Sequence, residues 1–82
     1  MREDVIAVRL FGPYREAAGS AELVVHLPEG STVGDLRVEL SERLGPTVLS
    51  GLAVAVNRRY ASEHDAVSPG DEVALIPPVA GG

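Results

Sequence analysis

A single amphipathic helix, with β-type segments on both sides of it, most constrains the fold of this chain. Thr32 is placed to cap the helix start, and Asp35 occupies the reciprocal position of a capping box. Apolar residues then follow at helical spacing on one face; they are Val33, Leu36, Leu40 and Leu44. Gly45-Pro46 supplies the stop, and Val38 lies off the apolar face. One such helix can cover one face of a sheet, which predicts an α+β fold.

Four runs of β-branched and other apolar residues predict the strands of that sheet. They cover residues 5–11, 21–27, 52–56 and 72–76, and residues 60–61 are expected to add a short edge strand. The short connection between the first two runs favours an antiparallel hairpin. The last strand is expected beside the first, in the centre of the sheet. The predicted architecture is a mixed sheet that forms a roll with one main helix.

Alternation along the strands predicts which side chains form the core. The inward-facing residues of the first two strands are Ile6, Val8, Leu10, Leu23, Val25 and Leu27. Residues 14–19 are expected to form a turn or one helical turn closed by Gly19. Residues 62–68 are expected to form a polar loop.

The composition limits the chain to one small domain and excludes several classes of function. It has 82 residues, of which 45% are hydrophobic, and it contains no cysteine. Disulfides, cysteine-based zinc sites and a thiol nucleophile are therefore excluded. No apolar run approaches the roughly 20 residues of a membrane span, and the charged residues 1–4 do not resemble a signal peptide. We expect a cytoplasmic protein without membrane contact.

The net charge of −5 argues against nucleic acid as a partner, because phosphate binding needs a basic surface. It suits a partner with a basic docking surface. His26 and His64 are far apart in sequence and lack further ligands at metal-binding spacing. No serine has a plausible triad, and no Gly-rich phosphate loop is present. We expect no metal site, no cofactor bound by this chain, and no catalytic side chain.

The final residues carry the chemistry that the rest of the chain lacks. Pro77 and Pro78 have no backbone N–H, so strand pairing must end there. Gly81 and Gly82 have no Cβ, so their backbone fits a slot too narrow for other residues. We expect a domain at residues 1–77 and a tail at residues 78–82, with the tail disordered unless a partner holds it.

Five extended residues reach about 17 Å, which is enough to enter the active site of a partner. A terminal carboxylate at Gly82 would be ionised at neutral pH. It could attack the α-phosphate of ATP and give an acyl-adenylate. Because the chain has no phosphate loop of its own, another protein would have to bind the ATP.

The closing run from Pro69 to Gly82 resembles the C-terminus of the small subunits of molybdopterin synthase, a family of ubiquitin-like β-grasp sulfur carriers. The shared pattern is Gly-Asp-Glu-Val, an apolar stretch, and Pro-Pro-Val-x-Gly-Gly. Ala55-Val56-Asn57 also resembles the family, as does Leu10-Phe11-Gly12 with Arg15-Glu16. The resemblance covers essentially the whole chain, with the elements in the same order.

This resemblance implies a β-grasp fold and a sulfur-carrier function. An E1-like adenylyltransferase would activate Gly82 with ATP, and a sulfur donor protein would convert the adenylate to a thiocarboxylate. The tail residues Pro78, Val79, Ala80 and Gly81 would thread into the large subunit of molybdopterin synthase, within a heterotetramer. There the sulfur would pass to cyclic pyranopterin monophosphate, in molybdenum cofactor biosynthesis. The carrier would be a non-catalytic subunit of that transferase.

Docking of the large subunit is expected on an apolar patch beside the tail. Phe11 and Ile76 occupy positions of their strands that alternate with the core-facing residues. With Tyr60 and Pro77 they would form this patch. Scattered surface hydrophobic residues are the alternative interpretation. A patch at the tail exit would, however, hold the tail in register.

Two other functions stay open. The first is a related carrier for thiazole (thiamine) synthesis or another thiolation pathway, which the Pro-Pro-Val approach to Gly-Gly disfavours. The second is a ubiquitin-like protein tag or a noncovalent interaction module. All 7 basic residues are arginine, so the protein cannot form lysine-linked chains of itself, although it could still modify other proteins.

Overall fold

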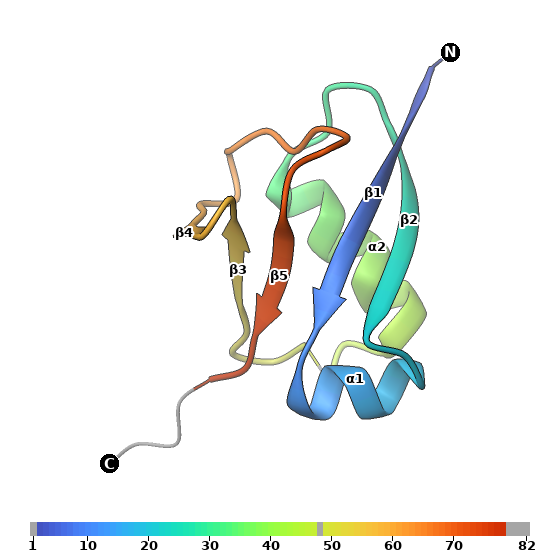
Figure 1. Ribbon diagram of the computed structural model, residues 1–82, viewed down its shortest axis with the longest axis vertical. Helices are drawn as coiled ribbons and strands as arrows, with labels where there is room; N and C mark the ends of the chain where they lie inside the picture. The colour runs from blue at the N-terminus through green and yellow to red at the C-terminus, as the bar shows by residue number, and fades with distance from the viewer. Residues whose placement is uncertain (1, 48, 79–82) are drawn as a thin grey trace.

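The computed structural model describes residues 2–47 and 49–78 of the chain. These residues form a five-stranded mixed sheet with two helices (Figure 1). The strands are β1 (Glu3–Leu10), β2 (Glu22–Pro28), β3 (Ala53–Val56), β4 (Arg59–Tyr60) and β5 (Val73–Ile76), and the helices are α1 (Gly12–Ala18) and α2 (Val33–Leu44). The predicted α+β roll is confirmed, although it contains one helix more than expected.

The helix α2 forms as the sequence predicts, because its first turn satisfies its own backbone groups. The Asp35 N–H donates to Thr32 Oγ1 at 3.3 Å, and the Thr32 N–H donates to Asp35 Oδ2 at 2.9 Å. This capping box gives partners to donors that a helix start otherwise leaves free. The predicted apolar face packs into the core; it consists of the buried Val33, Leu36 and Leu40 and the half-buried Leu44.

The strands lie in the order β2-β1-β5-β3-β4. β1 pairs antiparallel with β2 and parallel with β5, while β3 pairs antiparallel with both β5 and β4. The predicted hairpin and the central place of the last strand beside the first are thus confirmed. Parallel neighbours need a long crossover connection, and here that crossover contains α1, β2, α2, β3 and β4.

Alternation predicts the buried residues of β1 correctly and those of β2 with one exception. The buried strand residues are Ile6, Val8, Leu10, Val25, Leu27, Val54, Val73 and Leu75. Leu23 is only half-buried, whereas Val25 and Leu27 on the same strand are buried as predicted.

The turn expected at residues 14–19 is instead part of a seven-residue helix, α1. Pro13 lies in its first turn, where the fixed φ of proline suits a helix start. Gly19 ends the helix as predicted, with a left-handed φ of 71° and an N–H that donates to the Arg15 carbonyl at 2.9 Å. Tyr14 is fully buried in the core. Burial of this ring supplies stabilisation that so short a helix lacks by itself.

The loop predicted to be polar at residues 62–68 contributes Val67 to the core, where it is 1% exposed. The Val67 N–H donates to the Ser31 carbonyl at 3.0 Å, and the Val33 N–H donates to the Asp65 carbonyl at 2.8 Å. These bonds hold the loop against the start of α2. The prediction fails because a lone valine among polar residues gives no periodic pattern.

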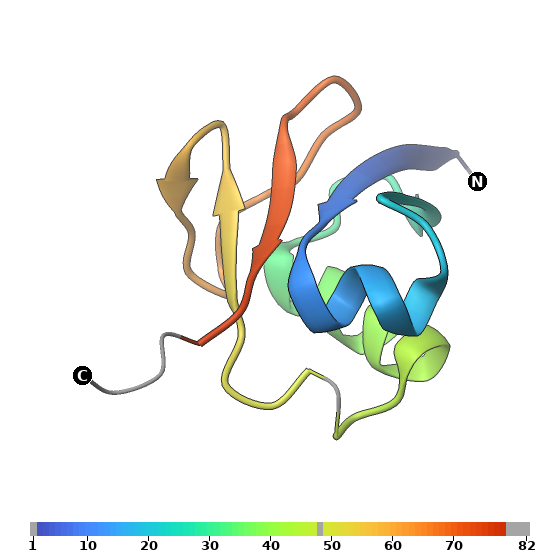
Figure 2. The ribbon, with the colours of Figure 1, turned by 60° about the horizontal axis from the view of Figure 1, so that its bottom comes forward.

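The helices leave one face of the sheet open. Figures 1 and 2 show α2 against one face and α1 across the end of the sheet, beside α2. No helix covers the opposite face in the part of the chain that the structure describes. Neither of these two helices has the length and apolar character needed to cross a membrane.

Tyr14 sets an alkaline limit on the stability of this fold. Its hydroxyl is buried and has no hydrogen-bond partner among the described residues. Burial raises the pKa of this phenol above its ordinary value of 10.0, and the charge of Arg37 opposes the shift. The unfolded chain therefore loses the proton at a lower pH than the folded chain, so stability should fall as the pH rises above about 10.

We predict that Tyr14→Phe removes this alkaline loss. At neutral pH its free energy of unfolding should be unchanged or about 1 kcal/mol higher, because a buried unsatisfied hydroxyl destabilises the fold. Urea unfolding at neutral and at alkaline pH measures both effects. Tyr60→Phe, at an exposed ring, is the control and should behave like the parent. An equally steep alkaline loss in Tyr14→Phe would contradict the prediction.

Candidate functional site

The tail that the sequence singles out is only partly described. Val79, Ala80, Gly81 and Gly82 lie outside the described residues, so the carrier role of Gly82 and the threading role of its neighbours stay predictions. The predicted domain boundary after residue 77 stays a prediction as well. Pro77 and Pro78, which we call the tail root, are described and follow β5 outside the strand. The candidate site therefore consists of the tail root and the surface around it.

Two glycines lie against the tail root. A Cβ on Gly12 would lie 3.6 Å from Pro77 Cγ, and a Cβ on Gly51 would lie 3.5 Å from Pro78 Cγ. Both glycines have left-handed φ angles, +54° and +77°, which residues with a Cβ rarely adopt. The tail root thus packs between the start of α1 and the loop before β3. Sequence patterns give no indication of either contact, because each joins residues far apart in the chain.

The open face of the sheet is apolar next to the tail root. β1 and β5 pair in parallel as far as Leu10 and Leu75, so Phe11 and Ile76 follow side by side. Ile76 also pairs with Ala53 on β3. Phe11 is 47% exposed and Ile76 is half-buried. The two large side chains predicted to dock a partner are therefore neighbours at the point where the tail leaves the sheet.

Tyr60 extends this surface to the edge strand β4. It pairs with Ala55, which pairs in turn with Ala74 on β5. Tyr60 is 78% exposed, and a shallow hollow between β3, β4 and β5 is lined by Ala55, Arg58, Tyr60 and Ile76. The short alanine side chains leave room beside the two larger ones. We call this surface the open-face patch; it consists of Phe11, Ala53, Ala55, Tyr60, Ala74 and Ile76.

A tight turn holds Tyr60 in position. The β3–β4 hairpin closes through Asn57 and Arg58, whose φ angles of 53° and 67° are left-handed, as two-residue hairpin turns require. Asn57 Oδ1 accepts a hydrogen bond from the Glu72 N–H at 3.0 Å, and Arg58 Nε donates to Glu72 Oε2 at 3.3 Å. The turn is thereby tied to the segment that enters β5. Tyr60 and Ile76 are held in a fixed relation as a result.

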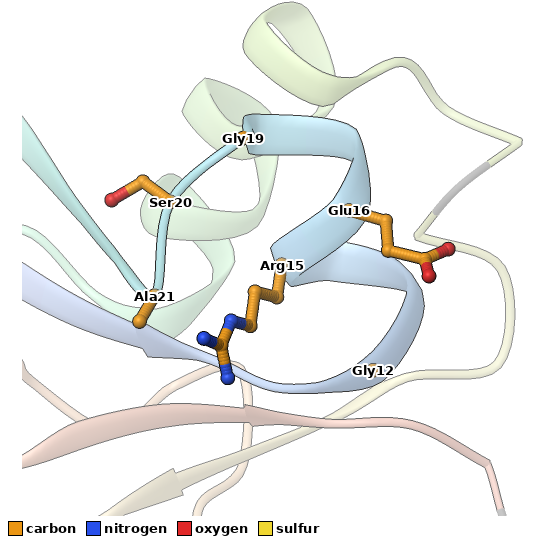
Figure 3. Close-up of a pocket in the computed structure, with 6 residues that line it drawn as sticks. All are labelled: Gly12, Arg15, Glu16, Gly19, Ser20 and Ala21. Atoms are coloured by element: carbon orange, nitrogen blue, oxygen red, sulfur yellow. The ribbon is translucent and has the colours of Figure 1, made fainter.

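A second hollow lies beside α1 (Figure 3) and is lined by Gly12, Arg15, Glu16, Gly19, Ser20 and Ala21. Figure 3 shows that the Arg15 and Glu16 side chains point away from each other. Ser20 Oγ is occupied by a hydrogen bond to the Glu22 carbonyl at 2.8 Å. The hollow therefore does not place a nucleophile beside a base, which nucleophilic catalysis requires.

The remaining chemistry-bearing side chains are dispersed. His26 Nδ1 lies 3.9 Å from Glu3 Oε1 on an exposed strand, and His64 is exposed in a loop. No group of histidine and carboxylate side chains within residues 2–47 and 49–78 is suited to hold a metal ion.

Comparison with known proteins identifies a family for this arrangement. The model of the ThiS family matches residues 8–82, a range that includes the tail as well as the fold. The chain belongs to the ThiS family. A curated relative from Arabidopsis thaliana, a molybdopterin synthase sulfur carrier subunit, is 35% identical to this ThiS family member over 79 residues, which cover 94% of this chain and 82% of the relative.

Two solved structures share the fold of this ThiS family member. Small archaeal modifier protein 1 of H. volcanii has a TM-score of 0.78 and 28% identity, over 93% of this chain and 99% of that chain. A chain from the complex of subunits 1 and 2 of molybdopterin-converting factor from Helicobacter pylori 26695 has a TM-score of 0.66 and 28% identity, over 95% of this chain and 99% of that chain. The predicted ubiquitin-like β-grasp fold is confirmed.

The contact between the tail root and Gly51 can be tested by substitution. Gly51→Val should destabilise the fold by about 1–2 kcal/mol because of its left-handed φ, and its side chain should also displace Pro78. Gly19→Val is a matched control, because its φ is +71° but no atom lies within 4 Å of its Cβ position. Denaturant unfolding should give similar losses for both variants. The NMR chemical shifts of Ile76 and Pro78 should change in Gly51→Val alone. Equal changes in Gly19→Val would contradict a specific contact between Gly51 and the tail root.

Proposed function

We propose that this chain is the sulfur carrier subunit of molybdopterin synthase in molybdenum cofactor biosynthesis. The observation that carries the proposal is the family match, which runs through the tail to Gly82 and is joined by a relative of that name across 94% of the chain. The fold supports it, because the tail root leaves the sheet beside an exposed apolar patch. A partner bound to that patch would receive the tail in a defined direction.

The proposed chemistry takes place on the carboxylate of Gly82. An E1-like adenylyltransferase binds ATP, and a carboxylate oxygen attacks the α-phosphorus, which releases pyrophosphate and leaves an acyl-adenylate. A sulfur donor protein then delivers sulfur at the sulfide level to the acyl carbon, and AMP departs with the bonding electron pair. The product is a thiocarboxylate. Its sulfur passes to cyclic pyranopterin monophosphate, and water restores the carboxylate.

The large subunit is proposed to bind the open-face patch together with Pro77 and to take up the tail from Pro78 onward. Phe11, Tyr60 and Ile76 supply the large side chains of this contact, and the alanines around them allow close approach. The relative in the Helicobacter pylori structure is one subunit of a two-subunit complex, which supports such a partner. We propose a heterotetramer of two small and two large subunits.

The carrier itself contributes no catalytic side chain in this scheme. ATP and the pterin are substrates bound by other proteins, and the chain is proposed to work in the cytoplasm without a cofactor of its own. Its contribution is to place one activated carbonyl at the end of a narrow tail. Gly81 and Gly82 suit that role because neither has a Cβ.

Protein modification is a second candidate function. The likeness to small archaeal modifier protein 1, with a TM-score of 0.78 at 28% identity, favours it. An amine of another protein would then attack the same adenylate at Gly82, giving an amide and releasing AMP and a proton. The two functions therefore share the first step and differ in the nucleophile.

The functions are separated by the intact mass of the protein after production with its activating enzyme and a sulfur donor. We predict one oxygen replaced by one sulfur at the C-terminus. Conjugates to other proteins with no such replacement would favour the modifier function. An otherwise identical protein with one alanine added after Gly82 is the control. It should fold normally and lose pterin thiolation, and retention of thiolation would contradict the carrier role of Gly82.

Docking on the open-face patch is tested with Ile76→Asp. Burying a charge against an apolar partner is costly, so affinity for the large subunit should fall about tenfold or more. Val38→Asp introduces the same side chain at an exposed valine on α2 and should leave this affinity unchanged. Isothermal titration calorimetry measures both. Equal affinities of the two variants would exclude the patch as the docking surface.

A further inference from the structure

The edge strand β2 directs part of its backbone away from the sheet. Backbone groups along an antiparallel strand alternate between the neighbouring strand and the outside. The Leu10 N–H donates to the Ala21 carbonyl at 2.9 Å, which fixes the odd-numbered residues of β2 toward β1. Glu22, Val24 and His26 therefore direct their N–H and C=O groups outward, at the edge where the sheet ends.

Side chains close one part of this edge and leave the other part free. Ser20 Oγ accepts from the Glu22 N–H at 3.2 Å and donates to the Glu22 carbonyl at 2.8 Å. Arg43 Nη1 donates to the Val24 carbonyl at 3.1 Å. Within the described residues, the Val24 N–H and both backbone groups of His26 have no such partner. Free groups in a row are a template for another extended segment.

A hollow lies at this end of the edge, between β2 and α2. Its lining comes from the end of β2, the following loop and the outer face of α2, and it includes Glu29, Val38, Glu39 and Glu42. Val38 is 62% exposed and gives the hollow an apolar wall. Val38 lies off the core face of the helix, and packing within the domain does not explain an exposed valine at this position.

Charge decides which occupant suits the hollow. Glu39 pairs with Arg43 at 3.6 Å, but Glu29 and Glu42 form no ion pair within the described part of the chain. A second copy of this protein would bring the same carboxylates and a further net charge of −5, so electrostatic repulsion opposes strand pairing between copies. A positively charged segment would meet complementary charge there.

We propose that the β2 edge and the acidic hollow beside it form a second docking site, for an extended segment of a partner protein rich in arginine or lysine. The segment adds to the sheet as a further strand through the backbone of Val24 and His26. It places an aliphatic side chain against Val38 and basic side chains beside Glu29 and Glu42. The site lies at the opposite edge of the sheet from Tyr60, so it is separate from the open-face patch and independent of the proposed function.

The test uses a short synthetic peptide of alternating arginine and valine as the probe. Amide hydrogen exchange by NMR should show slower exchange at Val24 and His26 when the peptide binds, because strand addition uses these groups. N-methylation of the peptide at alternate residues, on the side that faces β2, should abolish both the binding and the protection. Binding without slower exchange at Val24 and His26, or binding that survives N-methylation, would overturn the proposal.

Matched variants test the hollow by fluorescence anisotropy of the labelled peptide. Glu42→Arg should weaken binding about fivefold or more, since it removes one ion pair and adds repulsion. Glu16→Arg makes the same charge change on the exposed face of α1 and should have little effect. Val38→Ser should weaken binding without changing the net charge. Equal weakening by Glu42→Arg and Glu16→Arg would show charge attraction without a site and would overturn the proposal.

Discussion

The parallel pairing of β1 with β5 is the interaction on which the rest of the structure depends. Its core-facing residues are Val8, Leu10, Val73 and Leu75, and each is at most 1% exposed. Parallel neighbours cannot be joined by a tight turn, so the intervening chain must cross over, and that crossover supplies the helix that covers the pair. The pairing also brings the ends of both strands to one place. Phe11 therefore lies beside Ile76 and the tail root, although it is far from them in the sequence.

The sequence predicts those parts of the fold that follow from local patterns. Alternation identifies the buried faces of the strands, and the Thr32–Asp35 capping box identifies the start of α2 to the residue. Tyr14 and Val67 are among the core residues that escape prediction, because their burial is decided by contacts with distant segments. Tyr14 belongs to a helix that is stable only against the core, and Val67 is held by hydrogen bonds between its loop and the start of α2.

The candidate site likewise contains residues that local patterns predict and residues that depend on distant contacts. The alternation of side chains along the strands predicts that Phe11 and Ile76 face away from the core, and the structure shows this. Their proposed docking role depends instead on their position beside the point where the tail leaves the sheet. The contacts of Gly12 and Gly51 could not be assigned from sequence, because a glycine that lies against a distant proline has the same sequence signal as any turn glycine. The tail shows the opposite case. The role predicted for Gly81 and Gly82 comes from the resemblance of the closing run to a known family, and the family match through residue 82 supports it without any described geometry.

In the proposed function, one protein loads the carrier and another unloads it. Both would need the tail, so their docking surfaces around the tail root could not be occupied together. The strand order offers a way around this conflict. The edges β2 and β4 are separated by four strand spacings, or about 19 Å across the sheet. A segment paired with β2 therefore leaves the open-face patch accessible. A partner held at that edge could keep the carrier nearby while the tail passes between enzymes, and the high local concentration would favour transfer over release.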